Sequence, residues 1–192
     1  MNIFNKLLER RFLSPMMMLC LATGLCVTAN TALGAENLVV NGTFDSGIEG
    51  WRAWSDNADA LPSISFVADD GVGDKKGCLK VSFDKSAGDM VPWTLGAIMN
   101  FSQQQPPNFK VKISFSAKSL KGSRKLLISR PSGGGATEAV EMTDKWQQFE
   151  VQFSSKFETP FLAFAIIDPS SGKVDKGEFL LDNVSITTEP AK

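Results

Sequence analysis

The sequence predicts an all-β chain folded as an antiparallel β-sandwich. Apolar and polar residues alternate with a period of two in several segments, which is typical of strands that bury one face. Turn-forming residues such as Asp69-Asp70-Gly71 and Ser132-Gly133-Gly134-Gly135 separate these segments. No window carries apolar residues at the spacing of a capped amphipathic helix. One apolar and one polar face per strand favours two packed sheets.

The first 35 residues predict a secretory signal peptide. Three basic residues within the first 11 precede an apolar stretch over 12–27, and small residues at 32–35 suit the cut. The alternative is a membrane anchor, but the apolar stretch is shorter than the ~20 residues a span needs and is interrupted by polar residues and a proline. We therefore expect an exported protein, periplasmic or extracellular, with no membrane span after cleavage. The domain is expected over 36–187 and a short tail over 188–192.

The strands expected in the domain follow the apolar alternation. The clearest alternation covers residues 78–83, 109–118 and 148–153. Further strands are expected at 124–130, 160–167 and 178–186, with weaker candidates at 64–68 and 92–100. These short segments with turns between them indicate a sandwich or barrel of one domain.

Composition favours binding over catalysis. The chain has 20 basic and 21 acidic residues, so its charge gives no basis for binding nucleic acid or an anionic membrane. It has no histidine and no tyrosine, which excludes Ser-His-Asp triads and histidine metal sites. A glycosidase needs only two carboxylates, so that class stays open, although no acid lies in a recognisable catalytic motif. Only Cys78 survives the expected cleavage, so core packing or a metal must stabilise the domain.

Several short runs together resemble a known family. The domain opens with Asn37-Leu38-Val39-Val40-Asn41-Gly42-Thr43-Phe44-Asp45 and Gly50-Trp51, and closes with Leu181-Asp182-Asn183-Val184-Ser185-Ile186. Between them lie the runs Leu79-Lys80-Val81, the strand of Trp93, Ile113 to Ser119, Trp146 to Phe149, and Phe153. In this order the runs are similar to the carbohydrate-binding modules of families 4 and 9, within the galactose-binding-like β-jelly rolls.

The resemblance implies a non-catalytic module that binds a polysaccharide or oligosaccharide. It also allows a separate glycan-active enzyme as a partner. The alternative is a jelly-roll adaptor that binds protein or envelope partners instead of glycans, because a fold does not fix a function.

A structural calcium ion is also implied by the resemblance. In related modules, the first and last strands lie side by side, and the carboxylate after the motif phenylalanine and the aspartate of the closing motif share one calcium. The opening and closing runs of this chain are therefore expected to form neighbouring first and last strands. Carried over, Asp45 and Asp182 supply side chains and Thr43 a backbone oxygen, with Asp45 standing where such modules usually have glutamate. A charged carboxylate within an apolar strand costs several kcal/mol when unpaired, so Asp182 needs a partner. The alternative is a metal-free site in which hydrogen bonds satisfy it.

Candidate sugar contacts follow from the aromatic and planar polar residues. Flat rings stack on sugar faces, and planar polar groups bond the hydroxyls. Trp54 lies among polar residues, and Trp93 stands where related modules often present a stacking ring. Arg130 and Gln148 are the candidate polar partners. The other two tryptophans, Trp51 and Trp146, are expected to pack in the structure.

Overall fold

In the computed structural model, the segments with period-two alternation form strands of two antiparallel sheets. The structure describes residues 37–55, 61–73, 77–85, 95–100, 109–129, 137–155 and 161–190. All of them belong to the second of two compact units, Leu33–Lys192. The described residues form strands and no helix. The strands are β1 (Trp51–Ser55), β2 (Ser63–Val67), β3 (Cys78–Phe83), β4 (Leu95–Asn100), β5 (Phe109–Gly122), β6 (Lys125–Ser129), β7 (Thr137–Glu141), β8 (Gln147–Ser155), β9 (Phe161–Ile167) and β10 (Gly177–Pro190).

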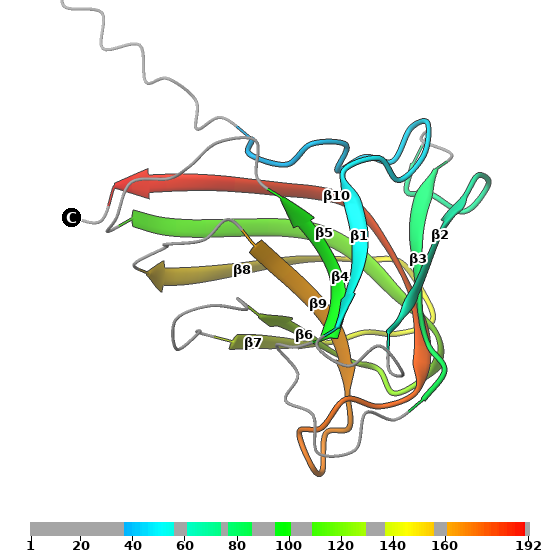
Figure 1. Ribbon diagram of the computed structural model, residues 1–192. Helices are drawn as coiled ribbons and strands as arrows, with labels where there is room; N and C mark the ends of the chain where they lie inside the picture. The colour runs from blue at the N-terminus through cyan, green and yellow to red at the C-terminus, as the bar shows by residue number, and fades with distance from the viewer. Residues whose placement is uncertain are drawn as a thin grey trace, which may run out of the picture. The chain divides into compact units, whose positions relative to one another are not determined.

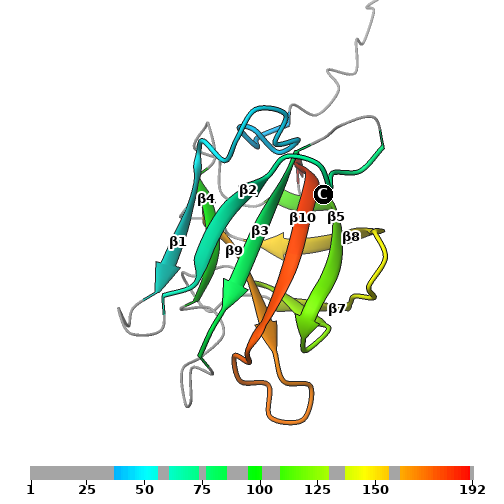
Figure 2. The same cartoon turned by 90° about the vertical axis from the view of Figure 1, so that its right-hand side faces the viewer.

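Each sheet contains five strands. The first sheet has the order β1-β4-β9-β6-β7, and the second has the order β2-β3-β10-β5-β8 (Figure 1). In the second sheet, β2, β3 and β10 run side by side, with β5 on the far side of β10 (Figure 2). The longest pairing joins β10 to β5, from Gly177 opposite Gly122 to Pro190 opposite Phe109. The predicted all-β jelly-roll sandwich is confirmed.

The core lies between the inward faces of the two sheets. Alternate residues of β5, including Ile113 and Phe115, are buried and pack with the first sheet. The Phe115 and Phe164 ring centroids are 5.3 Å apart in an edge-to-face arrangement. Trp51 also lies in this core, as expected, with its ring 5.1 Å from that of Phe44. Aromatic pairs at these separations favour tilted or edge-to-face geometry.

The observed bounds correct several expectations. The strand expected at 178–186 continues to Pro190, so residues 188–190 belong to a strand and not to a tail. The short strands β1 and β7 were not predicted, because neither shows a long alternating pattern. The opening run was expected to form the first strand, but it forms bends and turns over residues 41–50, with Val39 in a bridge, because Asn41 and Phe44 adopt positive φ angles of 55° and 48°. The expected signal peptide lies outside the described residues. Among the described residues, no helix is long and apolar enough to cross a membrane.

Candidate functional sites

The opening run and the last strand meet along a short ladder. Gly42 accepts a hydrogen bond at its carbonyl oxygen from the Val184 N–H at 2.8 Å. Leu38 donates from its N–H to the Ile186 carbonyl at 2.8 Å, and Ile186 donates from its own N–H to the Asn37 side-chain oxygen at 2.9 Å. The expectation that the two ends of the domain lie side by side is therefore confirmed.

The start of β3 joins the same junction. Gly77 precedes β3, and a Cβ atom added there would overlap the carbonyl oxygen of Phe44. Only glycine allows this close backbone approach. On β10, Asn183 has a φ angle of 50°. It lies where the register of the pairing with β5 shifts, between Asp182 and Ser185. Backbone strain of this kind is often found at binding sites.

Asp182 is fully buried at this junction. It lies on β10 opposite Ser116, on the face of the second sheet that points away from the core. Its Oδ2 accepts a hydrogen bond from the Val72 N–H at 2.8 Å, and its Oδ1 accepts one from the Asn183 N–H at 2.6 Å. Val72 belongs to the segment 68–73, which we call the strap. The expected buried carboxylate is present, and the strap covers it.

Asp45 and Thr43 lie in the turn beside the motif phenylalanine. Asp45 is exposed, and its Oδ2 accepts a hydrogen bond from the Thr43 hydroxyl at 2.7 Å. The carboxylates of Asp45 and Asp182 are hard oxygen donors of the kind that calcium prefers. Among the described residues, no three acidic or cysteine side chains gather into a metal-binding group. Calcium takes about six to eight oxygens, so an ion held by these two carboxylates would need backbone oxygens for part of its coordination.

The strap is also held by an ion pair that the sequence did not reveal. Lys118 on β5 contacts Asp70 of the strap at 2.6 Å, and its ammonium lies 5.2 Å from the centroid of the Trp146 ring. Asp70 is partly buried in this contact, although it stands in a turn-forming run. Trp146 is only partly buried and contacts this outward-facing lysine. The strap is thus fixed to the second sheet at both Asp182 and Lys118.

Cys78 lies beneath the strap and is expected to be chemically inert in the folded protein. Its side chain is fully buried. Burial, followed by the charges of Asp70 and Asp182, raises the pKa of the Cys78 thiol to about 12, while Lys118 opposes the shift. Because the thiolate is the reactive form, almost none is available at pH 8. Ellman's reagent should label the folded protein orders of magnitude more slowly than the guanidinium-unfolded protein; similar rates in both states would contradict the burial.

The candidate sugar contacts do not form one cluster. Trp54 lies on β1 opposite Gly96, and alternation from the buried Trp51 turns it away from the core. Gln148 is exposed on β8, in the other sheet, opposite Ser116. Trp54 and Gln148 therefore belong to different sheets. Trp93 and Arg130 lie outside the described residues.

The outward face of the first sheet is exposed at the β1 edge and buried at its centre, as far as the structure describes its side chains. One row of paired residues runs across this sheet, from Arg52 on β1 through Ile98 on β4 and Ala163 on β9 to Ser129 on β6. Arg52 at the β1 edge is exposed, whereas Ala163 and Ser129 at the centre are completely buried. Among the residues of this row whose burial is described, only Arg52 at the β1 edge is exposed, and it shares one face with Trp54.

Comparison with known proteins identifies the fold family. The model of a family described as "Carbohydrate binding domain" (CBM_4_9) matches residues 36–166. The curated proteins include no match. Among solved structures, the CBM22-1 xylan-binding domain of Xyn10C from Paenibacillus barcinonensis has a TM-score of 0.55 and 21% identity, covering 82% of this chain and 97% of that domain.

Two further solved structures have the same fold. The family 11 carbohydrate-binding module of the cellulosomal cellulase Lic26A-Cel5E of Clostridium thermocellum has a TM-score of 0.55 and 15% identity, covering 82% of this chain and 98% of that one. A CBM4 structure has a TM-score of 0.52 and 18% identity, covering 79% of this chain and 99% of that one. At these identities the likeness shows the shared fold.

Proposed function

The chain belongs to the carbohydrate binding domain family CBM_4_9, and from this we propose that it is an exported, non-catalytic module that binds a polysaccharide or oligosaccharide at the β1 edge of its first sheet. The observation that carries this location is the placement of Trp54 beside Arg52 on the outward face. The domain of similar fold from Paenibacillus barcinonensis is described as xylan-binding, which supports a polysaccharide as the ligand class.

The chemistry of this edge suits a sugar chain. The indole of Trp54 supplies a flat apolar surface for a pyranose ring, and the Arg52 guanidinium can donate several hydrogen bonds to hydroxyls. Trp93 lies two residues before Leu95, which pairs with Ser55 at the end of β1. We include Trp93 as a second stacking residue of the same site. Arg130, which follows Ser129 in the sequence, is proposed as a polar contact of the glycan.

Replacing Trp54 with alanine should weaken glycan binding at least tenfold, because aromatic residues at the centre of a contact commonly carry ~2 kcal/mol or more. Affinity electrophoresis in gels containing xylan, β-glucan or galactan measures the effect. The Trp93→Ala variant should behave in the same way. Gln152→Ala is the matched control, because Gln152 is exposed on β8 of the other sheet.

Gln148→Ala separates two arrangements of the site. A loss of retardation would extend the glycan contact to the second sheet, whereas unchanged retardation would restrict it to the first. If Trp54→Ala and Trp93→Ala both migrate like the unchanged protein in a gel that retards it, the β1 edge is not the binding site. If no glycan retards the unchanged protein, the adaptor function is favoured instead.

We also propose a structural calcium ion at the junction of the chain ends. Asp182 and Asp45 would hold it with their carboxylates, and Thr43 with its backbone oxygen. The donor set supports this, because a fully buried carboxylate lies beside a strained backbone segment at the place where both ends of the domain meet. When bound, the ion would supply positive charge that ties the opening run to β10 in a domain without a disulfide.

A further inference from the structure

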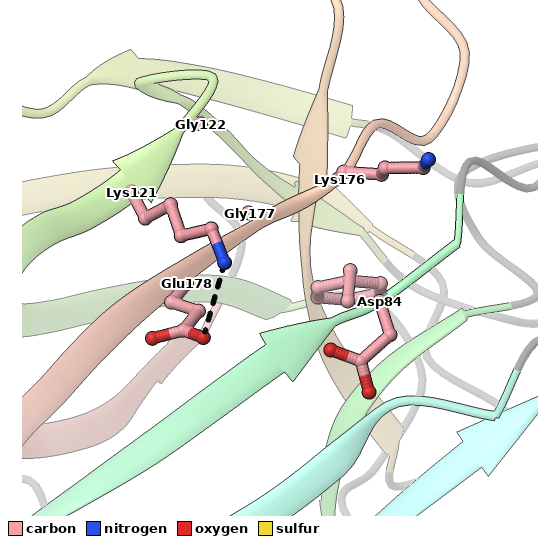
Figure 3. Close-up of a pocket in the computed structure, with 7 residues that line it drawn as sticks. Asp84, Lys121, Gly122, Lys176, Gly177 and Glu178 are labelled. Atoms are coloured by element: carbon pink, nitrogen blue, oxygen red, sulfur yellow. Dashed lines mark ion pairs between the residues drawn. The ribbon is translucent and has the colours of Figure 1, made fainter.

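A small pocket whose lining includes four charged side chains lies at the other end of the second sheet. It forms where β3 and β5 finish and β10 begins, and it has a volume of about 120 Å³. Its lining residues surround Gly177 (Figure 3). They are Phe83, Asp84, Lys121, Gly122, Lys176, Gly177 and Glu178. Cys78 and Phe83 are the two ends of β3, so the pocket is separated from the Asp182 junction by the length of that strand.

The shape of the pocket limits what can enter. Gly122 and Gly177 contribute no side chains, and a Cβ atom at either position would overlap backbone atoms of the neighbouring strand. Phe83 is only 4% exposed and offers no open ring face for stacking. A volume of about 120 Å³ holds several waters, and it suits the polar edge of one sugar unit.

Side chains of both charge signs line the pocket, and Lys80 adds a further ammonium group beside Glu178. Asp84 and Glu178 are acidic, and Lys121 and Lys176 are basic. Glu178 contacts Lys80 at 2.9 Å and Lys121 at the longer distance of 3.9 Å. The Lys121 side chain is 74% exposed, so it is free to turn towards a ligand. An anionic ligand would meet two carboxylates, and a cationic ligand would meet two ammonium groups.

A neutral sugar satisfies both kinds of group at once. A hydroxyl donates one hydrogen bond and accepts others, so neighbouring hydroxyls can donate to a carboxylate and accept from an ammonium. Hydrogen bonds to charged groups are stronger than those between neutral groups. They can replace the bonds of the several waters that the ligand displaces.

We propose that this pocket is a second carbohydrate site, which binds one neutral pyranose unit through its hydroxyls. The inference rests on the proposed glycan-binding function and adds to it a contact for a single sugar unit, such as a chain end. Asp84 and Glu178 accept hydrogen bonds from the sugar, and Lys121 and Lys176 donate to it. Recognition here uses hydrogen bonds, whereas the β1 edge uses ring stacking.

Backbone amide NMR titration of the protein with D-glucose, D-galactose, D-xylose and D-mannose tests the proposal. At least one of these sugars should shift the amides of Gly122, Gly177 and Glu178 in a saturable way. The double variant Asp84→Asn, Lys176→Met should bind that sugar at least tenfold more weakly. The control Lys173→Met, an exposed lysine of the same connection, should bind it unchanged. Trp54→Ala should also leave these shifts unchanged.

The outcomes distinguish this site from the β1 edge. If none of the four sugars moves these amides while a polysaccharide still retards the protein through Trp54, only the second site is excluded. If no sugar moves them and no polysaccharide retards the protein, both proposals fail. If sodium glucuronate shifts the same amides at lower concentration than every neutral sugar, the pocket selects anions and the argument from charges of both signs is wrong.

Discussion

Replacing Phe44 with alanine should lower the free energy of unfolding by about 3–5 kcal/mol, the usual loss for a buried phenylalanine. Phe44 is completely buried, although it lies in a turn of the opening run and not in a strand. Its ring lies 5.1 Å from that of Trp51, which in turn lies 6.3 Å from that of Phe164 on the first sheet. The opening run therefore contributes to the core as well as to the proposed metal site. Urea unfolding followed by tryptophan fluorescence measures the loss.

Phe66→Ala is the matched control for this variant. Phe66 lies on the edge strand β2 and is 38% exposed, so its removal should cost about 1 kcal/mol or less. The urea m-value should stay the same in both variants, because the fold and its buried area are retained. Equal losses in the two variants would show that Phe44 is not a core residue.

Strands were predictable wherever one face of the strand meets the core and the other meets solvent. The expected segment 78–83 matches β3, and the segments expected at 109–118 and 148–153 lie inside β5 and β8. The strand β9 is a different case, because every residue from Leu162 to Ile167 is buried. Its continuous apolar run predicts a strand. It does not predict that the second face of the strand is also buried, since the pattern cannot distinguish a buried face from an exposed one.

The burial of Asp182 was predictable, but the way the chain covers it was not. An acid inside the apolar run Phe179-Leu180-Leu181 indicates a carboxylate held within a strand, and the structure confirms it. The strap contact depends on Asp70 and Lys118, which are 48 residues apart and each sit in a pattern typical of a solvated surface. Long-range ion pairs of this kind leave no local signal in one sequence. The positive φ of Asn183 is likewise hidden, because asparagine tolerates that conformation without requiring it.

Removing calcium with EGTA should lower the midpoint of thermal unfolding by about 5–10 °C. An ion present at 100 times its dissociation constant stabilises the folded state by ~2.7 kcal/mol. For a domain of this size, each kcal/mol shifts the midpoint by about 2–4 °C. The variant Asp182→Asn keeps the shape of the side chain but removes its charge, so its midpoint should no longer respond to calcium or EGTA. Differential scanning calorimetry with and without added calcium measures both effects.

Asp45→Asn and Asp168→Asn identify where the ion binds. Asp45 is exposed at the edge of the junction, so its variant should keep a smaller calcium response. Asp168 accepts hydrogen bonds from Ser170 in a turn after β9, and its variant should respond to calcium as fully as the unchanged protein. If the unchanged protein melts at one temperature with calcium and with EGTA, the ion is not a structural element. Asp182 would then be stabilised by its hydrogen bonds to the strap and to Asn183, because a buried carboxylate that accepts backbone N–H groups can remain charged without a metal.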